Sequence, residues 1–181
     1  MNLKEAAVHC VGTQAATLTT YLGFEYFHPD LIISIGTAGG VKQNHAALKD
    51  IYLSQKIYFY DRRLSFKGYH EYGLGGYQSI NLSPIDKKIG FKSGIICSGD
   101  SFDDNPTDYN VFIKQNCAAI GMEAAGVAWV SMLTKTPMIA IKGVTNFVKG
   151  DDIHQQYESN FAMVTLELSK KLKEFLKSVT L

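Results

Sequence analysis

Apolar residues along the chain form short runs that alternate with longer stretches in which they recur every three or four positions. The short runs are rich in β-branched residues and predict strands, most of them covered on both faces. They lie at 6–11, 31–35, 50–61, 94–97 and 137–146. Helical spacing is expected at 15–27, with Thr13 as the capping residue, and at 154–178. Strands that alternate with helices predict an α/β sheet with helices on both faces, in a single domain over residues 1–181.

Composition narrows the functional classes. The chain is 46% hydrophobic and carries a formal charge of +1 from 18 basic and 17 acidic residues. This balance lacks the basic excess that nucleic acid or anionic membranes select, and no apolar run is long enough to span a membrane. The three cysteines, Cys10, Cys97 and Cys117, lack metal-ligand spacing and favour free buried thiols. We therefore expect a cytoplasmic protein without a metal, nucleic-acid or membrane partner.

Polar or glycine-rich residues follow three of the expected strands, at 36–40, at 98–102 and at Thr145-Asn146. Ligands of open α/β sheets bind at such strand ends, so one pocket is expected to collect these segments. The glycines at 36–40 either let the backbone approach a ligand or form a tight turn that needs positive φ. The loop at 62–76 is expected to be a lid or subunit contact, or else an ordinary surface loop.

One carboxylate, Glu123, lies among small and apolar residues at 119–129. A charge in such surroundings is costly to desolvate unless a hydrogen bond compensates it, so we expect Glu123 to have a partner. The alternative is a buried helix start, where the helix dipole and backbone amides stabilise the carboxylate.

Five segments in this order carry a resemblance that covers nearly the whole chain. They are PDLIISIGTAGG (29–40), DIYLSQKIYFYDRR (50–63), CSGDSFD (97–103), GMEAAGVAWV (121–130) and IKGVTNFVKGDD (141–152). By these segments the chain resembles the nucleoside phosphorylase and nucleosidase superfamily, most closely its plant-type methylthioadenosine/S-adenosylhomocysteine nucleosidases. The resemblance implies a mixed central sheet with helices on both faces, and a purine nucleoside or purine base as ligand. It also implies a homodimer in which the loop from Phe66 to Tyr72 completes the neighbour's pocket.

The resemblance also implies roles for individual residues. Glu123 would accept hydrogen bonds from the ribose hydroxyls, with Met122 packed against the sugar. Thr37 would lie near the ribosyl centre, and Gly39 belongs to the same substrate-binding segment. Further implied contacts are Phe102 stacked on the purine, Asp103 beside it, and Tyr157 at the 5′ substituent. Tyr157 also fits a plain helix core.

Three positions depart from the nucleosidase pattern. Asn146 replaces an aspartate that protonates the leaving purine, Gly121 replaces an acidic residue, and Tyr60 replaces a histidine. An amide cannot deliver a proton in this way, but it can donate to one purine atom and accept from the next, as relatives acting on 6-oxopurine nucleosides do. The family's first strands, with a glutamate that activates water, would precede Val8, and we expect the chain to lack them.

Three functions follow from these observations. The first is hydrolysis of the N-glycosidic bond of methylthioadenosine, S-adenosylhomocysteine or a related purine nucleoside, without metal or organic cofactor. The second is phosphate-dependent cleavage of 6-oxopurine nucleosides, which Asn146 favours. The third is a truncated or degenerate family member that binds purine or nucleoside without turnover.

Overall fold

The computed structural model describes residues 10–102 and 105–179. Most of the strand expected at 6–11, and Asp103 among the expected site residues, lie outside the described residues.

The described residues form a six-stranded mixed sheet in the order β3-β2-β4-β5-β1-β6. Its strands are β1 (Ile32–Gly40), β2 (Ile51–Phe59), β3 (Gly75–Gln78), β4 (Lys92–Ser98), β5 (Cys117–Gly121) and β6 (Met138–Phe147). Neighbours run parallel in β1–β6, β2–β4 and β4–β5, and antiparallel in β1–β5, β2–β3 and β2–β6. Because β2 also pairs with β6, five strands close into a ring, and β3 extends β2 outside it.

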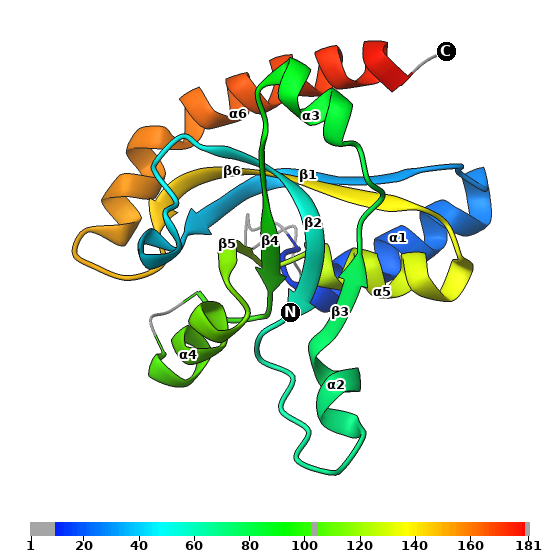
Figure 1. Ribbon diagram of the computed structural model, residues 1–181, viewed down its shortest axis with the longest axis horizontal. Coiled ribbons are helices and arrows are strands. Elements are labelled where there is room, and N and C mark those ends of the chain that lie inside the picture. Colours follow the sequence, from blue (N-terminus) through cyan, green and yellow to red (C-terminus); the bar gives the residue numbers. More distant parts are fainter. Residues whose placement is uncertain (1–9, 103–104, 180–181) are drawn as a thin grey trace, which may run out of the picture.

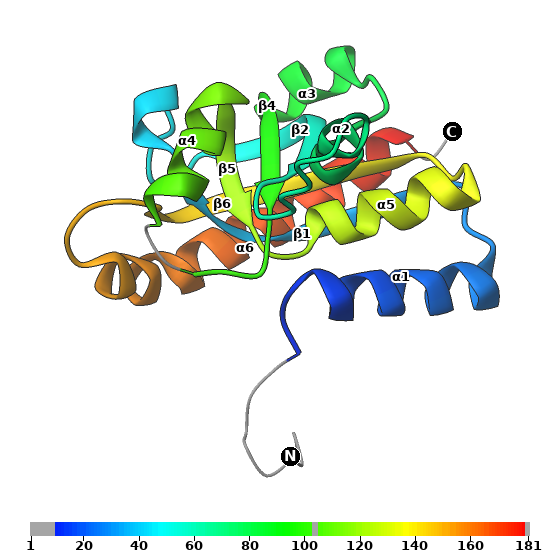
Figure 2. The same cartoon turned by 90° about the horizontal axis from the view of Figure 1, so that it is seen from below.

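Helices cover this sheet on both sides, as the sequence predicts. They are α1 (Thr13–Phe27), α2 (Tyr69–Leu74), α3 (Ser83–Ile89), α4 (Pro106–Lys114), α5 (Ala124–Thr134) and α6 (Ile153–Val179), with a short 3-10 turn η1 (Lys42–Asn44). The long helix α6 and α3 lie on one side of the sheet (Figure 1), where α6 packs against β6 and β1. The helices α1 and α5 lie side by side on the other (Figure 2). No helix in the described part of the chain combines the length and apolarity of a membrane span.

Two of the three apolar cores in the described part of the chain join these layers. One includes the buried alanines of α5, together with Ile57, Ile96 and Val144 of the sheet. The other joins the α6 stripe of Val164, Leu168 and Phe175 to Ile139 and Ile141 of β6. The apolar periodicity at 154–178 therefore marks core packing along most of α6.

The glycine-rich segment Gly36–Gly40 is part of strand β1, so its interpretation as a tight turn is wrong. None of its glycines has positive φ. The two at its end are needed for close packing instead: a Cβ on Gly39 would lie 2.7 Å from Val148 Cγ1, and one on Gly40 would lie 2.7 Å from Val144 Cγ1. Their small size lets the end of β6 and the segment after it pack directly on β1.

Two other local predictions also need correction. Thr13 does not cap α1, because Gly12 is the N-cap and the Thr13 side chain instead donates to Asp100. The loop at 62–76 contains α2 and the beginning of β3.

The prediction of three free buried thiols is wrong. Cys97 on β4 and Cys117 on β5 are paired in a disulfide, with their Cα atoms 5.9 Å apart and both side chains fully buried. Cys10 is free but exposed. The two paired cysteines are 20 positions apart in the chain, and only the parallel pairing of β4 with β5 brings them together. The expectation of a cytoplasmic location rested on three free cysteines, and two of these three are paired.

Candidate active site

A cavity of about 1100 Å³ is lined by residues at or just after the ends of five strands, β1, β2, β4, β5 and β6, and by the beginning of α6. The sheet register explains this convergence, because Gly39 on β1 lies beside Asn146 on β6 and Ile120 on β5, while Ser98 on β4 lies beside Gly121. The sequence-predicted residues on the cavity wall are Thr37, Gly39, Phe102, Met122, Glu123, Asn146 and Tyr157. The structure therefore brings together every predicted site residue that it describes.

Glu123 begins α5 and has a charged partner that the sequence did not reveal. Its Oε2 accepts hydrogen bonds from Lys142 Nζ at 3.0 Å and from the Met122 backbone amide at 3.3 Å. The Lys142 side chain is 2% exposed, whereas that of Glu123 is 37% exposed. Lys142 thus lies behind the cavity wall, and Glu123 carries a carboxylate to the cavity surface. Among the described residues Oε1 has no hydrogen-bond donor, so it is free to accept from a ligand.

Two glycines lie beside the buried ammonium, and one of them, Gly36, leaves space for it. Gly36 pairs with Lys142 across β1 and β6, and a Cβ there would lie 3.3 Å from Lys142 Nζ. A Cβ on Gly121 would lie 3.6 Å from the same atom. The absence of a side chain at Gly36 therefore accommodates the cation that pairs with Glu123, whereas a methyl group at Gly121 would make only an ordinary contact.

Asn146 is buried at the end of β6, with its amide held in one orientation. Its Oδ1 accepts from Thr145 Oγ1 at 2.9 Å, and its Nδ2 donates to the Phe147 carbonyl at 3.1 Å. The same strand end is supported from α6, where Gln156 accepts from the Phe147 amide and Asn160 donates to the Thr145 carbonyl. These bonds leave one hydrogen on Nδ2 and one acceptor position on Oδ1, which together can read the edge of a base.

An aromatic wall closes one side of the cavity. The Phe102 ring lies 5.8 Å from that of His154 and 6.4 Å from that of Tyr157, between ring centroids. Phe102 is 53% exposed and offers a free face to a planar ligand. Tyr157 lines the cavity, and its ring neighbour Phe161 is exposed, so the structure supports the cavity position of Tyr157 and not the helix-core alternative. His154 was missed in the sequence, where it preceded the periodic stripe of α6.

Thr37 and Tyr60 serve different purposes. The Thr37 hydroxyl has no hydrogen-bond partner among the described residues and lies on the cavity wall, available to a ligand. Tyr60 is 3% exposed, and its hydroxyl donates to the Ser101 carbonyl at 2.7 Å. Tyr60 therefore supports the segment that ends in Phe102.

Within the described part of the chain, no three His, Cys, Asp or Glu side chains cluster as metal ligands would.

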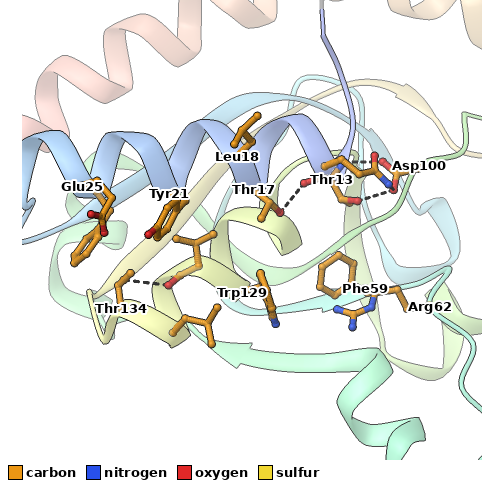
Figure 3. A pocket seen from close by; sticks show the side chains of 14 residues that line it. Thr13, Thr17, Leu18, Tyr21, Glu25, Phe59, Arg62, Asp100, Trp129 and Thr134 are labelled. Atoms are coloured by element: carbon orange, nitrogen blue, oxygen red, sulfur yellow. Dashed lines mark hydrogen bonds between the residues drawn. The ribbon is translucent and has the colours of Figure 1, made fainter.

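A second cavity, of about 870 Å³, lies between α1 and α5 (Figure 3). Tyr21 of α1 lies toward Trp129 of α5, and Asp100 lies at one end of the cavity. Leu18 and Leu133 also belong to its lining. Its lining contains none of the sequence-predicted site residues.

Comparison with known proteins places this chain and its fold in a family. The model of the phosphorylase superfamily matches residues 6–179. A 5′-methylthioadenosine/S-adenosylhomocysteine nucleosidase of Arabidopsis thaliana is 34% identical over 96% of this chain and 68% of its own length. A 5′-methylthioadenosine nucleosidase of the same plant is 33% identical over 89% of this chain and 61% of its own length. The chain thus spans about two thirds of these relatives.

A solved structure supports the same family assignment. The apo structure of Arabidopsis thaliana 5′-methylthioadenosine nucleosidase superimposes with a TM-score of 0.92 at 31% identity, and covers 96% of this chain and 71% of its own. The resemblance inferred from the five sequence segments is confirmed. The chain belongs to the phosphorylase superfamily and is similar within it to the plant methylthioadenosine/S-adenosylhomocysteine nucleosidases.

Proposed function

We propose that the protein hydrolyses the N-glycosidic bond of methylthioadenosine, S-adenosylhomocysteine or a related purine nucleoside. The observation that carries the proposal is the convergence of Glu123, Thr37, Phe102 and Asn146 on one cavity. The names of the plant relatives support this class of substrate.

Glu123 supplies the main electrostatic contribution. Cleavage of an N-glycosidic bond passes through a state in which the ribosyl group becomes cation-like, so an anion beside the sugar stabilises charge that develops only on the way to the transition state. The carboxylate accepts hydrogen bonds from the ribose hydroxyls through the oxygen that Lys142 leaves free. Lys142 holds the other oxygen and keeps the carboxylate at the cavity surface.

The base lies between the aromatic wall and Asn146. Phe102 stacks on the purine, and Tyr157 lies toward the 5′ substituent. Asn146 binds the purine edge with one donor and one acceptor, which orients the leaving group without delivering a proton to it. Thr37 lies beside the ribosyl centre with a free hydroxyl.

The test is purine release from methylthioadenosine, S-adenosylhomocysteine and inosine, each with and without phosphate and measured by chromatography. Hydrolysis predicts release of adenine or hypoxanthine at a rate that does not depend on phosphate. Release that requires phosphate would refute hydrolysis. Calorimetric binding of a purine without any product after long incubation would instead identify a family member that binds without turnover.

A phosphate-dependent phosphorylase of 6-oxopurine nucleosides is the second candidate. It is favoured by the fixed amide of Asn146, because a donor and an acceptor side by side match a 6-oxo group and the neighbouring ring nitrogen. Phosphate-dependent release of hypoxanthine from inosine, with little action on methylthioadenosine, would establish it.

We propose further that two copies of the chain associate through the face formed by α1 and α5. Large apolar side chains are exposed there, among them Leu18 at 61% and Leu133 at 57%. Sedimentation velocity on Leu18→Glu should show a monomer where the wild type is a dimer. The matched control is Leu176→Glu, since Leu176 is also exposed but lies on α6. A monomeric wild type, or no difference between the two variants, would contradict the assignment.

A further inference from the structure

The segment from Gly99 to Phe102 reaches the cavity from the end of β4 and is fixed to its surroundings before Phe102. The Gly99 amide donates to the Gly121 carbonyl, and the Asp100 amide donates to Asp61 Oδ2 at 2.6 Å. The Ser101 amide donates to the Tyr60 hydroxyl at 3.3 Å. The end of β5 and the two residues that follow β2 thus hold the backbone of this segment.

The Asp100 side chain makes a separate connection, to the beginning of α1 (Figure 3). Its Oδ1 accepts from the Thr13 amide at 2.6 Å, and its Oδ2 accepts from the Thr13 hydroxyl at 2.5 Å and from Gln14 Nε2 at 3.0 Å. A carboxylate at this place also faces the positive end of the helix dipole.

A side chain would not fit at the two glycines beside these contacts, Gly12 and Gly99. Gly12 has φ 102°, and a Cβ there would lie 2.5 Å from Asp100 Oδ1. A Cβ on Gly99 would lie 2.6 Å from Asp61 Oδ2. Glycine at both positions lets the two carboxylates approach the backbone amides that they bind.

We propose that Asp100 is a positioning residue: it ties the segment carrying Phe102 to the N-terminus of α1 and thereby sets the affinity for the purine. Asp100 lines the second cavity and is absent from the lining of the first, so it acts on the ligand through Phe102. The inference rests on the proposed function, in which Phe102 stacks on the base. Without the carboxylate, the segment keeps only its backbone bonds to Gly121, Asp61 and Tyr60, and Phe102 samples positions that do not meet the base.

The expected signature is a rise in KM with little change in kcat. Stacking on the base is present in the bound substrate and in the transition state alike, so its loss removes binding that is uniform along the reaction. Asp100→Ala removes three hydrogen bonds to a charged group and is expected to raise KM about 10-fold, with kcat within about 2-fold of wild type.

Two substitutions of Thr13 provide a matched comparison with a smaller expected effect than Asp100→Ala. Thr13 is 8% exposed, so its substitution leaves the surface nearly unaltered. Thr13→Val keeps the shape and the backbone amide but removes the hydroxyl, and is expected to raise KM about 3-fold. Thr13→Ser keeps the hydroxyl and should restore the wild-type KM.

The experiment combines steady-state kinetics on methylthioadenosine with hydrogen exchange of the free protein. In Asp100→Ala, the backbone amides of residues 100 and 101 should exchange faster, although the substitution leaves their own acceptors in place. Phe175→Leu is the stability control, because Phe175 is fully buried near the far end of α6. It should lower the melting temperature and leave KM unchanged.

Three results would overturn the inference. They are unchanged exchange at residues 100 and 101 in Asp100→Ala, a fall in kcat with KM unchanged, and an equal rise in KM in Phe175→Leu. If the wild type releases no purine from any nucleoside, the proposed function fails. The exchange measurement then decides the positioning role by itself: faster exchange at residues 100 and 101 supports it, and wild-type exchange refutes it.

Discussion

The ion pair between Glu123 and Lys142 gives a prediction about stability that is asymmetric between its two partners. Lys142 is 2% exposed and Glu123 is 37% exposed, so the cation is the member that depends on its partner for compensation. In Glu123→Gln the ammonium keeps a hydrogen-bond acceptor but loses the opposite charge. We expect the free energy of unfolding to fall by about 1–3 kcal/mol, below the range for a fully buried pair because Glu123 is more than a third exposed.

Substitution of the other partner, Lys142, should lower the free energy of unfolding by less. Lys142→Met removes the buried charge and fills its space with a flexible apolar side chain, and it leaves a carboxylate that the cavity solvent can hydrate. We expect a loss of at most about 1 kcal/mol in stability. Activity should nevertheless fall, by about 10-fold or more in kcat/KM, because the carboxylate loses the donor that orients it.

The assay is a double-mutant cycle with Glu123→Gln, Lys142→Met and the double variant, measured by urea unfolding. The double variant should recover much of the stability lost in Glu123→Gln, since it no longer buries an uncompensated ammonium. The reasoning is refuted if the two effects add within about 0.5 kcal/mol, or if Lys142→Met is the more destabilising single change.

Three further predictions concern the base, the core and the response to pH. Asn146→Asp should raise cleavage of 6-aminopurine nucleosides relative to 6-oxopurine ones, because a carboxyl group can protonate the leaving base; unchanged or lost activity in chromatographic assays would exclude this role. Gly143→Ala should lower the free energy of unfolding by about 1–3 kcal/mol in urea titrations, because the added methyl group meets Val164 in the core. Burial, with a further contribution from Asp50, raises the pKa of Tyr52 to about 12 from its ordinary 10.0. As the pH rises, the unfolded chain therefore loses the Tyr52 proton before the folded protein does. The contribution of Tyr52 to the free energy of unfolding is complete below pH 10 and is lost between pH 10 and 12. This loss should be absent from Tyr52→Phe when unfolding is measured across that range.

Much of the fold could be predicted because most of its strands are short runs rich in β-branched residues. The ranges 50–61 and 137–146 contain β2 and β6 nearly intact, and 154–178 matches α6. Strand β5 was missed because its sequence is alanine-rich and short, and alanine has little strand preference of its own. Helix α4 was missed although its start was readable: Asn105 accepts from the Thr107 amide, and Pro106 begins the helix.

The segments at 36–40, at 98–102 and at Thr145-Asn146 were found because small, polar and aromatic residues at strand ends are visible in the sequence, whereas Met122 and Tyr157 were assigned through the family resemblance. Their partners were not found, since partnership depends on which strands are neighbours. Lys142 lies 19 positions from Glu123, and nothing in its apolar strand showed that its ammonium points toward that carboxylate. The contact of Asp100 with Thr13 spans 87 positions and was hidden for the same reason.

The measurement that tests the account most directly is adenine release from methylthioadenosine in phosphate-free buffer, with wild type and Glu123→Gln compared side by side. The account predicts steady release by the wild type and a rate about 10²-fold lower for the variant, whose side chain keeps the shape but not the charge. Equal rates for the two proteins, or no adenine from the wild type, would contradict it.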